Sequence, residues 1–257
     1  MTWPAAQFPG NGNDLADTET FPDKKPTWTF TDALALIGVY ILTNTFLLFL
    51  ASLFVGSGSL LLYAVPLTGA PIFTLTLAYI GIRVRTPSDE SVASLMGFRI
   101  PEFRRTVIAV PLVLAGGIGL LMAVNVIQNL IVSSLGISPE DIPSQHAIEL
   151  LRQDPGLEMT IALTFFAVVV APFTEEVLFR STLYLPLRSR TTPIIACFVV
   201  SFLFAVVHWY AWGNFHLFVI SLILVALLET TRSLLVPIAV HAMYNGLVIA
   251  ALFAGWT

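Results

Sequence analysis

Residues 171–180 read Ala-Pro-Phe-Thr-Glu-Glu-Val-Leu-Phe-Arg, and they set two glutamates and an arginine inside a long apolar run. The run covers about residues 159–186, and roughly 20 apolar residues are enough for a helix to cross a bilayer. A charged side chain near the bilayer centre costs about 2.5 to 3.5 kcal/mol on insertion scales. The charges of this segment therefore need partners or a function inside the membrane.

The composition of the whole chain agrees with a membrane location. Of 257 residues, 56% are hydrophobic and 11% are charged, whereas about a quarter of the residues are charged in a typical soluble domain. Apolar stretches predict seven transmembrane helices, over about residues 30–55, 59–82, 106–134, 159–186, 192–210, 214–230 and 233–255. A tight turn at Gly213 and Asn214 separates the fifth from the sixth, so one of these two is re-entrant in an alternative interpretation. We expect an all-α fold, a polytopic transmembrane helical bundle of about seven spans with the lipid bilayer as its surroundings.

The charged residues outside the spans predict the orientation. The first 28 residues are polar and lack a short apolar core with a cleavage site, so we expect a cytoplasmic tail over 1–28 and no cleaved signal peptide. With this tail inside, Arg152 falls in an outer segment, and the inner segments contain Lys24, Lys25, Arg83, Arg85, Arg99, Arg104, Arg105, Arg188, Arg190 and Arg232. Basic residues are enriched on the cytoplasmic side of membrane proteins. The N-terminus is therefore predicted to be cytoplasmic, with residues 29–257 forming a single transmembrane domain.

The sequence argues against a nucleic-acid partner and against a disulfide within the chain. No Lys/Arg-rich or aromatic-interleaved stretch offers a surface for phosphates, so nucleic acid is not an expected partner. Cys197 is the single cysteine, which excludes a disulfide within the chain, and we expect it to be a small buried apolar residue.

Helix geometry separates the two glutamates of residues 171–180. Glu176 and Arg180 are four residues apart, so they lie on one helix face and can form an ion pair. Glu175 points about 100° away from that pair on a helix of about 3.6 residues per turn and needs a polar cavity or a partner of its own. Pro172 lacks an N–H and clashes with the carbonyl four residues earlier, which predicts a kink before the glutamates. An alternative is that all three charges are a buried ion network that fixes helix register.

Two later spans add polar side chains. The fifth contains Phe204-Ala-Val-Val-His208, and the seventh contains His241-Ala-Met-Tyr-Asn245, in which His241 and Asn245 share a helix face. A lone histidine in an apolar helix is usually a packing residue, but two histidines, an asparagine and Glu175 on three spans are predicted to converge on one site. At about 1.5 Å of rise per residue, Glu175, His241 and Asn245 lie roughly 14 to 20 Å from inner-side arginines, whereas His208 lies about 27 Å away. The depth of His208 therefore disagrees with the other three, unless the fifth span is tilted or begins deeper in the membrane.

These motifs resemble those of a known family. Glu-Glu-x-x-x-Arg at 175–180, Phe-x-x-x-His at 204–208 and His-x-x-x-Asn at 241–245 look like the three ordered motifs of the CPBP family. That family comprises CAAX prenyl endopeptidases and bacteriocin-processing or self-immunity membrane proteins, also called Abi proteins. The resemblance covers about residues 160–250, the expected catalytic core. The chain departs from the family pattern at Ser181, where Gly is usual, and at 231–233, where Thr-Arg-Ser replaces a Gly-containing turn.

The resemblance implies an intramembrane endopeptidase that hydrolyses a peptide bond of a membrane-associated protein or peptide, such as a prenylated CAAX protein. It implies that Glu175 is the base that activates water with the help of His208, and that His241 and Asn245 support the oxyanion. The residues implied to support this site are Glu176, Arg180 and Phe204.

The metal requirement stays open. Glu175, His208 and His241 are candidate ligands for a zinc ion with water in the fourth position, yet the sequence has no His-Glu-x-x-His helix to hold one. The family is described both as a metalloprotease and as a metal-independent glutamate protease.

Two other activities are weighed against hydrolysis. One is a non-catalytic membrane binding or immunity protein of the same family. The other is a proton-coupled transporter, because intramembrane Glu and His also form proton relays, although no inverted repeat is present in the sequence. Of the remaining polar residues, His146 and His216 are expected to be incidental. The third span contains amides that we expect to hold helices together, namely Asn125, Gln128 and Asn129.

Overall fold

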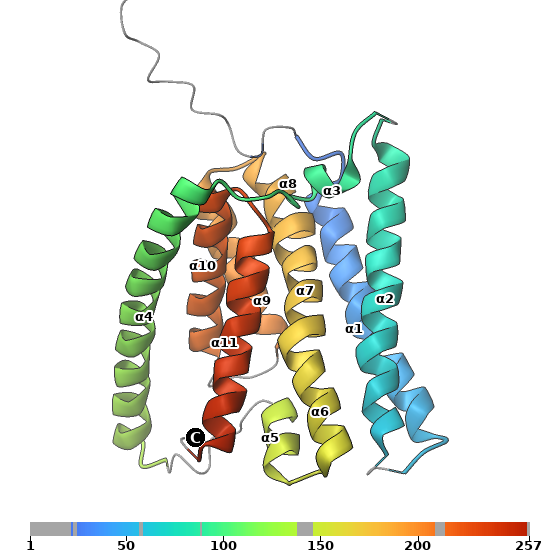
Figure 1. The fold of residues 1–257 in the computed structure, drawn as a ribbon, viewed down its shortest axis with the longest axis vertical. Helices are drawn as coiled ribbons and strands as arrows, with labels where there is room; N and C mark the ends of the chain where they lie inside the picture. Colours follow the sequence, from blue (N-terminus) through green and yellow to red (C-terminus); the bar gives the residue numbers. More distant parts are fainter. Residues whose placement is uncertain are drawn as a thin grey trace, which may run out of the picture.

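The fold is helical throughout the part of the chain that the computed structural model describes, which comprises residues 22, 25–56, 59–87, 89–137, 146–208 and 214–255 (Figure 1). Six helices in these ranges are long and apolar enough to cross a membrane, and there is one shorter apolar helix. The predicted all-α transmembrane bundle is confirmed. The protein is a multi-pass integral membrane protein.

The helices follow the predicted spans closely. Outside the fourth span they are α1 (Phe30–Ser52), α2 (Leu60–Arg85), α4 (Phe103–Ser134), α9 (Pro193–Val207), α10 (Asn214–Thr231) and α11 (Leu235–Phe253). The fourth span is built from α6 (Leu157–Phe165), η2 (Phe166–Val170), α7 (Ala171–Glu176), η3 (Val177–Tyr184) and α8 (Leu185–Arg188), of which η2 and η3 are π-helical. Two short helices that the sequence did not predict, α3 (Val92–Leu95) and α5 (His146–Arg152), lie in the connections at 84–105 and 135–157.

Local sequence signals explain where several helices begin. Thr29 caps α1 and forms a capping box with Asp32, while the Ser59 hydroxyl caps α2. Thr192 caps α9 and is followed by Pro193, whose missing N–H is harmless in the first turn of a helix. These helix starts are therefore set by residues adjacent to the apolar runs.

The helix α9 is short for a membrane span. It has 15 residues and ends at His208, its C-cap residue. A helix of this size is about 22 Å long, whereas the hydrocarbon core of a bilayer is about 30 Å thick. Because α9 starts at Pro193 rather than at Arg190, the helical path to His208 is shorter than predicted. The sequence left the depth of His208 unresolved, and in the structure His208 Nε2 lies 3.7 Å from Glu175 Oε2, so the two side chains are at the same level.

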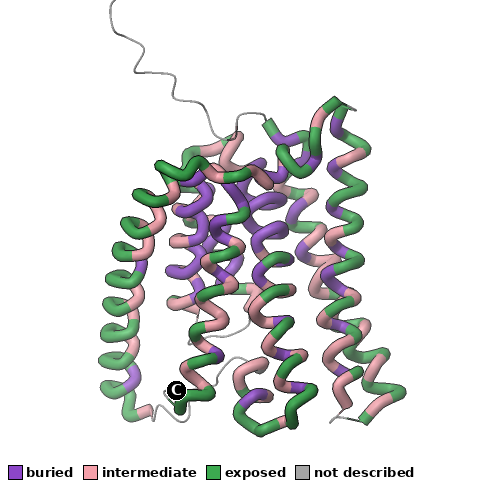
Figure 2. Tube along the Cα trace, viewed as in Figure 1, coloured by how far each residue is buried: buried purple, intermediate pink, exposed green. Residues whose placement is uncertain are grey.

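The fourth span stands in the middle of the bundle (Figure 1). The helices α1 and α2 pack against each other on one side of it, and α4 stands at the opposite edge, packed on α10. Buried residues gather in the central helices, whereas α4 is mostly exposed and α1 and α2 are exposed along part of their surface (Figure 2). Large apolar side chains on these outer helices, such as Phe46, Ile72 and Leu112, are exposed and match a lipid environment.

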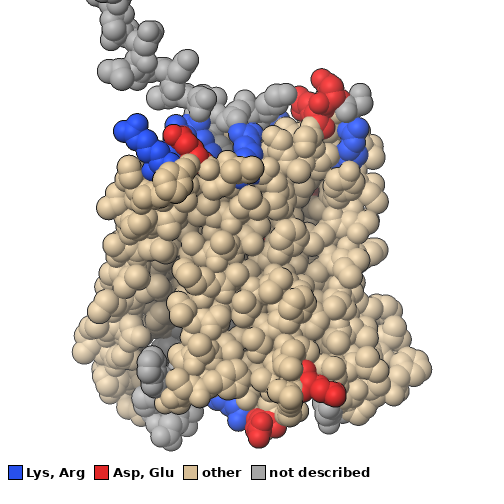
Figure 3. Space-filling model, viewed as in Figure 1, with Lys and Arg blue, Asp and Glu red and all other residues tan. Residues whose placement is uncertain are grey.

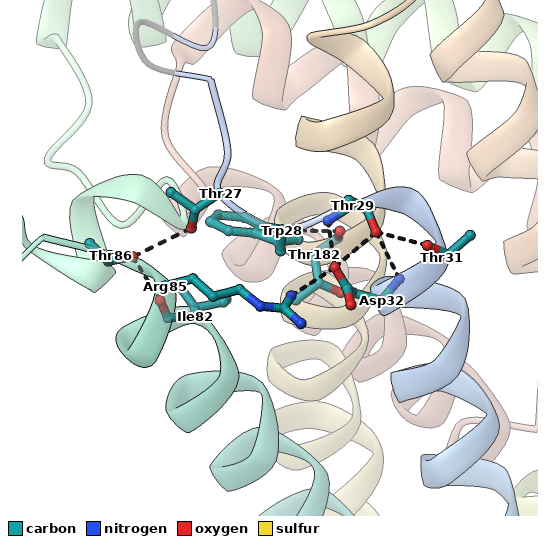
Figure 4. Close-up of polar contacts among 9 residues, drawn as sticks. All are labelled: Thr27, Trp28, Thr29, Thr31, Asp32, Ile82, Arg85, Thr86 and Thr182. Carbon is teal, nitrogen blue, oxygen red and sulfur yellow. Dashed lines mark hydrogen bonds and ion pairs between the residues drawn. The ribbon is translucent and has the colours of Figure 1, made fainter.

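The helix pair α1–α2 is tied to the fourth span at one end of the bundle (Figure 4). Trp28 is buried, and its indole Nε1 donates to the carbonyl oxygen of Thr182 in η3 at 2.9 Å. Arg85 at the end of α2 pairs with Asp32 at the start of α1, with 2.8 Å between Nη1 and Oδ2. Most of the tail predicted over 1–28 lies outside the described residues, but Trp28 belongs to the folded domain.

Charged side chains gather at the two ends of the bundle (Figure 3). Basic residues occupy the last turns of α2 and α8 and the first turn of α4, and these helix ends lie together at one end of the bundle, shown at the top of Figure 1. The helix α5, which contains Arg152, lies at the opposite end. Basic residues are therefore concentrated at the end of the bundle where α2 and α8 end and α4 begins.

Candidate active site

Glu176 and Arg180 lie in the buried middle of the fourth span. Both side chains are fully buried, and Arg180 Nε lies 3.0 Å from Glu176 Oε2, so the predicted ion pair is present. Arg180 Nη2 also donates to Ser221 Oγ of α10 at 3.0 Å, and the guanidinium lies over the Phe204 ring, 4.6 Å from its centroid. Ser221 was not predicted, and its only signal in the sequence is a serine within the apolar run of α10. The arginine is thus enclosed by three helices.

Glu176 has a second partner that the sequence did not predict. Its Oε1 lies 2.8 Å from His241 Nδ1, so the carboxylate joins Arg180 on its own span to His241 on α11. Because a carboxylate only accepts hydrogen bonds, His241 Nδ1 is the donor in this contact. The bond fixes the imidazole so that its other nitrogen, Nε2, faces Glu175.

Glu175 faces away from the ion pair, as helix geometry predicts. Its side chain is 18% exposed, whereas that of Glu176 is 0% exposed. Glu175 Oε2 lies 3.7 Å from His208 Nε2 and 3.8 Å from His241 Nε2. These distances exceed the usual length of a hydrogen bond, so the three groups surround a common point without closed contacts. The structure therefore brings together Glu175, His208 and His241 from three separate helices.

Packing and one backbone contact orient His208. Its Nδ1 lies 2.6 Å from the carbonyl oxygen of Phe204, one turn earlier in α9. The Phe204 ring lies 4.6 Å from the His208 ring and 5.1 Å from the Phe179 ring, centroid to centroid. Phe204 therefore supports both the His208 imidazole and the Arg180 guanidinium.

Asn245 is held by the backbone irregularity next to Pro172. In η2 the N–H of Ala171 donates to the carbonyl five residues earlier, that of Phe166. The next donor in this pattern would be the N–H of residue 172, which proline lacks, so the carbonyl of Ala167 needs another donor. Asn245 Nδ2 provides it at 2.8 Å. A kink was predicted at Pro172, and the structure has this π-helical segment immediately before it.

A cavity of about 570 Å³ adjoins these groups. Its lining includes Glu175, His208, His241 and Asn245, and apolar side chains such as Leu67. Along α11 the lining continues from His241 to Leu252, and it includes residues of α5, so the cavity extends from the middle of the bundle toward the end that holds α5. It reaches the surface at Arg152, which is exposed and lines it. Glu175 thus has the polar cavity that its position required.

The remaining polar predictions have mixed outcomes. Asn125 and Asn129 were expected to hold helices together, and the contact that the structure describes is within α4, where Asn129 Nδ2 donates at 2.7 Å to Asn125 Oδ1. Both residues line the cavity, as do Gln128 and His216. The side chain of His146 lies outside the described residues. The cavity therefore has a polar wall that the motifs did not include.

The two departures from the family pattern have structural settings. Ser181 is fully buried in η3, and its hydroxyl has no hydrogen-bond partner among the described residues. Arg232 has a φ of 56°, in the left-handed region that favours glycine. The adjacent Ser233 donates to the carbonyl of Arg99, and Leu234 donates through its N–H to the carbonyl of Gly97 at 2.8 Å. The start of α11 is thereby anchored to the connection that contains α3.

The candidate zinc ligands lie near one another without forming a complete donor set. Among the residues that the structure describes, no group of three or more His, Cys, Asp or Glu side chains is arranged to hold a metal ion. Glu175, His208 and His241 approach one point, but two of their contacts are with each other at 3.7 and 3.8 Å. The chemistry derived from this geometry uses protein groups and water.

Residues 157–247 match the family model described as type II CAAX prenyl endopeptidase Rce1-like. The matched region runs from the start of α6 into α11 and contains all three motifs. This match confirms the resemblance to CAAX prenyl endopeptidases, and the matched family is one of membrane peptidases. No curated protein and no solved structure matched the chain.

Proposed function

We propose that this chain, whose residues 157–247 are similar to type II CAAX prenyl endopeptidases, is an intramembrane endopeptidase in which Glu175 activates the attacking water. Its substrate is a membrane-associated protein or peptide, with a prenylated CAAX protein as the class that the family similarity favours. The observation that supports this most is the convergence of Glu175, His208 and His241 on one wall of a cavity.

Glu175 and His208 are placed to orient the water. His208 Nδ1 contacts a carbonyl oxygen, which only accepts, so Nδ1 bears the proton and Nε2 of the neutral ring has a lone pair. A water between His208 Nε2 and Glu175 Oε2 donates one hydrogen to each and directs its own lone pair toward the substrate carbonyl. Glu175 takes up the proton as the C–O bond forms and later passes it to the leaving amine. Such general base catalysis is typically worth about 10²- to 10⁴-fold in rate.

His241 and Asn245 are placed to stabilise the oxyanion of the tetrahedral intermediate. They share a face of α11 and line the cavity beside Glu175. Asn245 uses one N–H on Ala167, and its second N–H can donate to the oxyanion. His241 donates from Nε2 when both ring nitrogens are protonated, since Nδ1 is already bonded to Glu176. A fixed donor of this kind is commonly worth about 10²- to 10³-fold.

We also propose that the N-terminus is cytoplasmic. The basic ends of α2, α4 and α8 lie together at one end of the bundle, and such residues are enriched on the cytoplasmic side. Reporters at the N-terminus and in the connection at 84–105 should be cytoplasmic, and one at 135–157 should not. A cytoplasmic reporter at 135–157 would overturn this orientation.

A proteoliposome assay tests the function against its two alternatives. The purified chain is reconstituted with a fluorescein-labelled peptide of about ten residues that ends in a farnesylated cysteine and three further residues. A peptidase releases a fragment, whereas a binding or immunity protein retains the intact peptide. A proton-coupled transporter takes the peptide up only under a pH gradient. Retention or uptake of intact peptide without cleavage would contradict the proposal.

A further inference from the structure

The inner-facing stripe of α4 changes character along its length. Over the first half, Val113 and Leu121 pack against a cluster of α10 that contains Leu224. Gly117 lies between them, and a Cβ atom there would come within 2.4 Å of Ile223 Cδ1, so the two helices are in close contact at this point. Beyond Leu121 the same stripe continues at helical spacing with amides, and the amides are Asn125, Gln128 and Asn129.

These amides lie beyond Leu121, the last residue of α4 that packs against that cluster. All three line the cavity, and Asn125 and Asn129 are exposed rather than packed against another helix. Figure 1 shows α4 standing apart from α11 at the end of the bundle that holds α5, so the amides of α4 and the catalytic groups of α11 are on different walls of one cavity. A polar group at membrane depth needs a hydrogen-bond partner, and among the described residues Asn125 and Asn129 bond each other within α4 rather than a neighbouring helix.

The hydrogen-bonding capacity of these amides selects their ligand. Asn125 and Asn129 each have two N–H donors and one acceptor oxygen, and the bond from Asn129 Nδ2 to Asn125 Oδ1 uses one donor and one acceptor. Among the described residues, this leaves three of the four N–H donors and Asn129 Oδ1 to bind a ligand. A phosphate group offers acceptors alone and an acyl chain offers neither, whereas a peptide backbone offers N–H and C=O groups in alternation. A helical peptide already pairs these groups internally, so the complementary ligand is an extended peptide.

We propose that Asn125 and Asn129 form a subsite of α4 that binds the backbone of an extended substrate segment across the cavity from His241 and Asn245. This subsite rests on the proposed endopeptidase function, which makes a peptide the occupant of the cavity. It assigns the substrate class as a peptide that is unwound next to the bond to be cleaved. The amides bind the chain alike in the ground state and the transition state, so they lower KM and leave kcat unchanged.

Binding and backbone N-methylation together test the subsite. Affinity is measured by fluorescence anisotropy in the non-cleaving Glu175→Gln background, with the farnesylated peptide described above and a series of its analogues N-methylated at one residue each. The double variant Asn125→Leu/Asn129→Leu should bind the parent peptide about tenfold more weakly, because a hydrogen bond contributes about 0.5 to 1.5 kcal/mol. At least one N-methyl group should weaken binding to the unaltered amide wall and have no further effect in the double variant.

The matched control is the double variant Val126→Ala/Leu130→Ala, which changes exposed apolar residues of the same helix. It should bind every peptide as the parent does. In protein that retains Glu175, the double variant Asn125→Leu/Asn129→Leu should raise KM about tenfold with kcat unchanged.

Equal N-methylation effects in parent and double variant, or no peptide binding at all, would overturn the subsite. Displacement of the peptide by phosphatidylglycerol vesicles from the parent alone would assign the amides to a lipid headgroup instead. Peptide binding with the expected N-methylation pattern but without cleavage by the wild type would leave the subsite standing and remove the proposed function.

Discussion

The two adjacent glutamates differ in how closely their carboxylates are paired. We call the face of the fourth span that bears Glu176 the closed side, and the face that bears Glu175 the open side. On the closed side, Glu176 is fully buried, with Oε2 in an ion pair 3.0 Å from Arg180 Nε and Oε1 2.8 Å from His241 Nδ1. On the open side, Glu175 borders the cavity and stands 3.7 and 3.8 Å from two histidines. A single step along the helix thus separates a carboxylate with close charged partners from one that borders a cavity.

In the proposed mechanism, this difference lets the protein keep a reactive carboxylate in an apolar surrounding. The closed side supplies fixed geometry, because breaking a buried pair leaves an uncompensated charge. The open side supplies reactivity, because a base must have room for the proton it takes up. The link between the two sides is His241, which contacts Glu176 with one nitrogen and faces Glu175 with the other.

The largest expected effect belongs to the closed side. Glu176→Gln and Arg180→Ala should each lower the stability of the folded protein by about 3 to 5 kcal/mol, since each strands a buried charge. The measurement is the thermal midpoint and yield in detergent. Arg104→Ala, at an exposed position at the start of α4, is the control and should behave as wild type. A stable but inactive Glu176→Gln protein would reverse the roles of the two glutamates.

The next effect belongs to the open side. Glu175→Gln retains the size of the side chain and removes the base, so cleavage should fall by at least about 10²-fold while the thermal midpoint stays near that of wild type. Cleavage of the farnesylated peptide in proteoliposomes measures this. Glu158→Gln, an exposed carboxylate in the first turn of α6, should cleave normally. Near wild-type cleavage by Glu175→Gln would refute the hydrolytic role.

A smaller effect is expected at Ser221, which tests how far the closed side extends. Ser221→Ala removes a hydrogen bond to a buried guanidinium, and such bonds to charged groups contribute about 1.5 to 3 kcal/mol. The thermal midpoint should fall, by less than in Arg180→Ala, and kcat of the remaining folded protein should be unchanged. Ser52→Ala, whose hydroxyl bonds only its own helix backbone, serves as the comparison. A lower kcat at unchanged stability would instead place Ser221 on the open side.

The smallest effect concerns metal. The geometry gives Glu175 and the histidines roles that need water alone, so chelators and dialysis should leave kcat unchanged. The test measures peptide cleavage and bound zinc before and after treatment with a chelator. Loss of activity that zinc restores, together with loss of bound zinc in His208→Ala and His241→Ala, would show that the open side is a metal centre.

The sequence predicted those parts of the molecule that depend on neighbours along the chain. The apolar run at 214–230 became α10, and the four-residue spacing of Glu176 and Arg180 became an ion pair. The contacts of Ser221 and of Asn245 with Ala167 were not predictable, because they depend on how separate helices are aligned. The end of α9 was missed because apolar residues continue past His208 in the sequence, and composition does not show where a helix stops. The contact between the α4 amides was also not predictable, because a polar residue in a span indicates that a partner exists without identifying it.

The shortness of α9 has a consequence for the surrounding lipid. With a length of about 22 Å, it falls about 8 Å short of a typical hydrocarbon core. A hydrophobic mismatch of this kind is relieved by thinning of the bilayer or by displacement of flanking residues, at a fraction of a kcal/mol for each ångström. His208 stands at the end of this short helix, so we expect the bilayer to be locally thin next to the candidate active site. A peptide that approaches from the adjacent leaflet therefore has less hydrocarbon to cross, and the thickness of the host membrane becomes a property on which turnover depends.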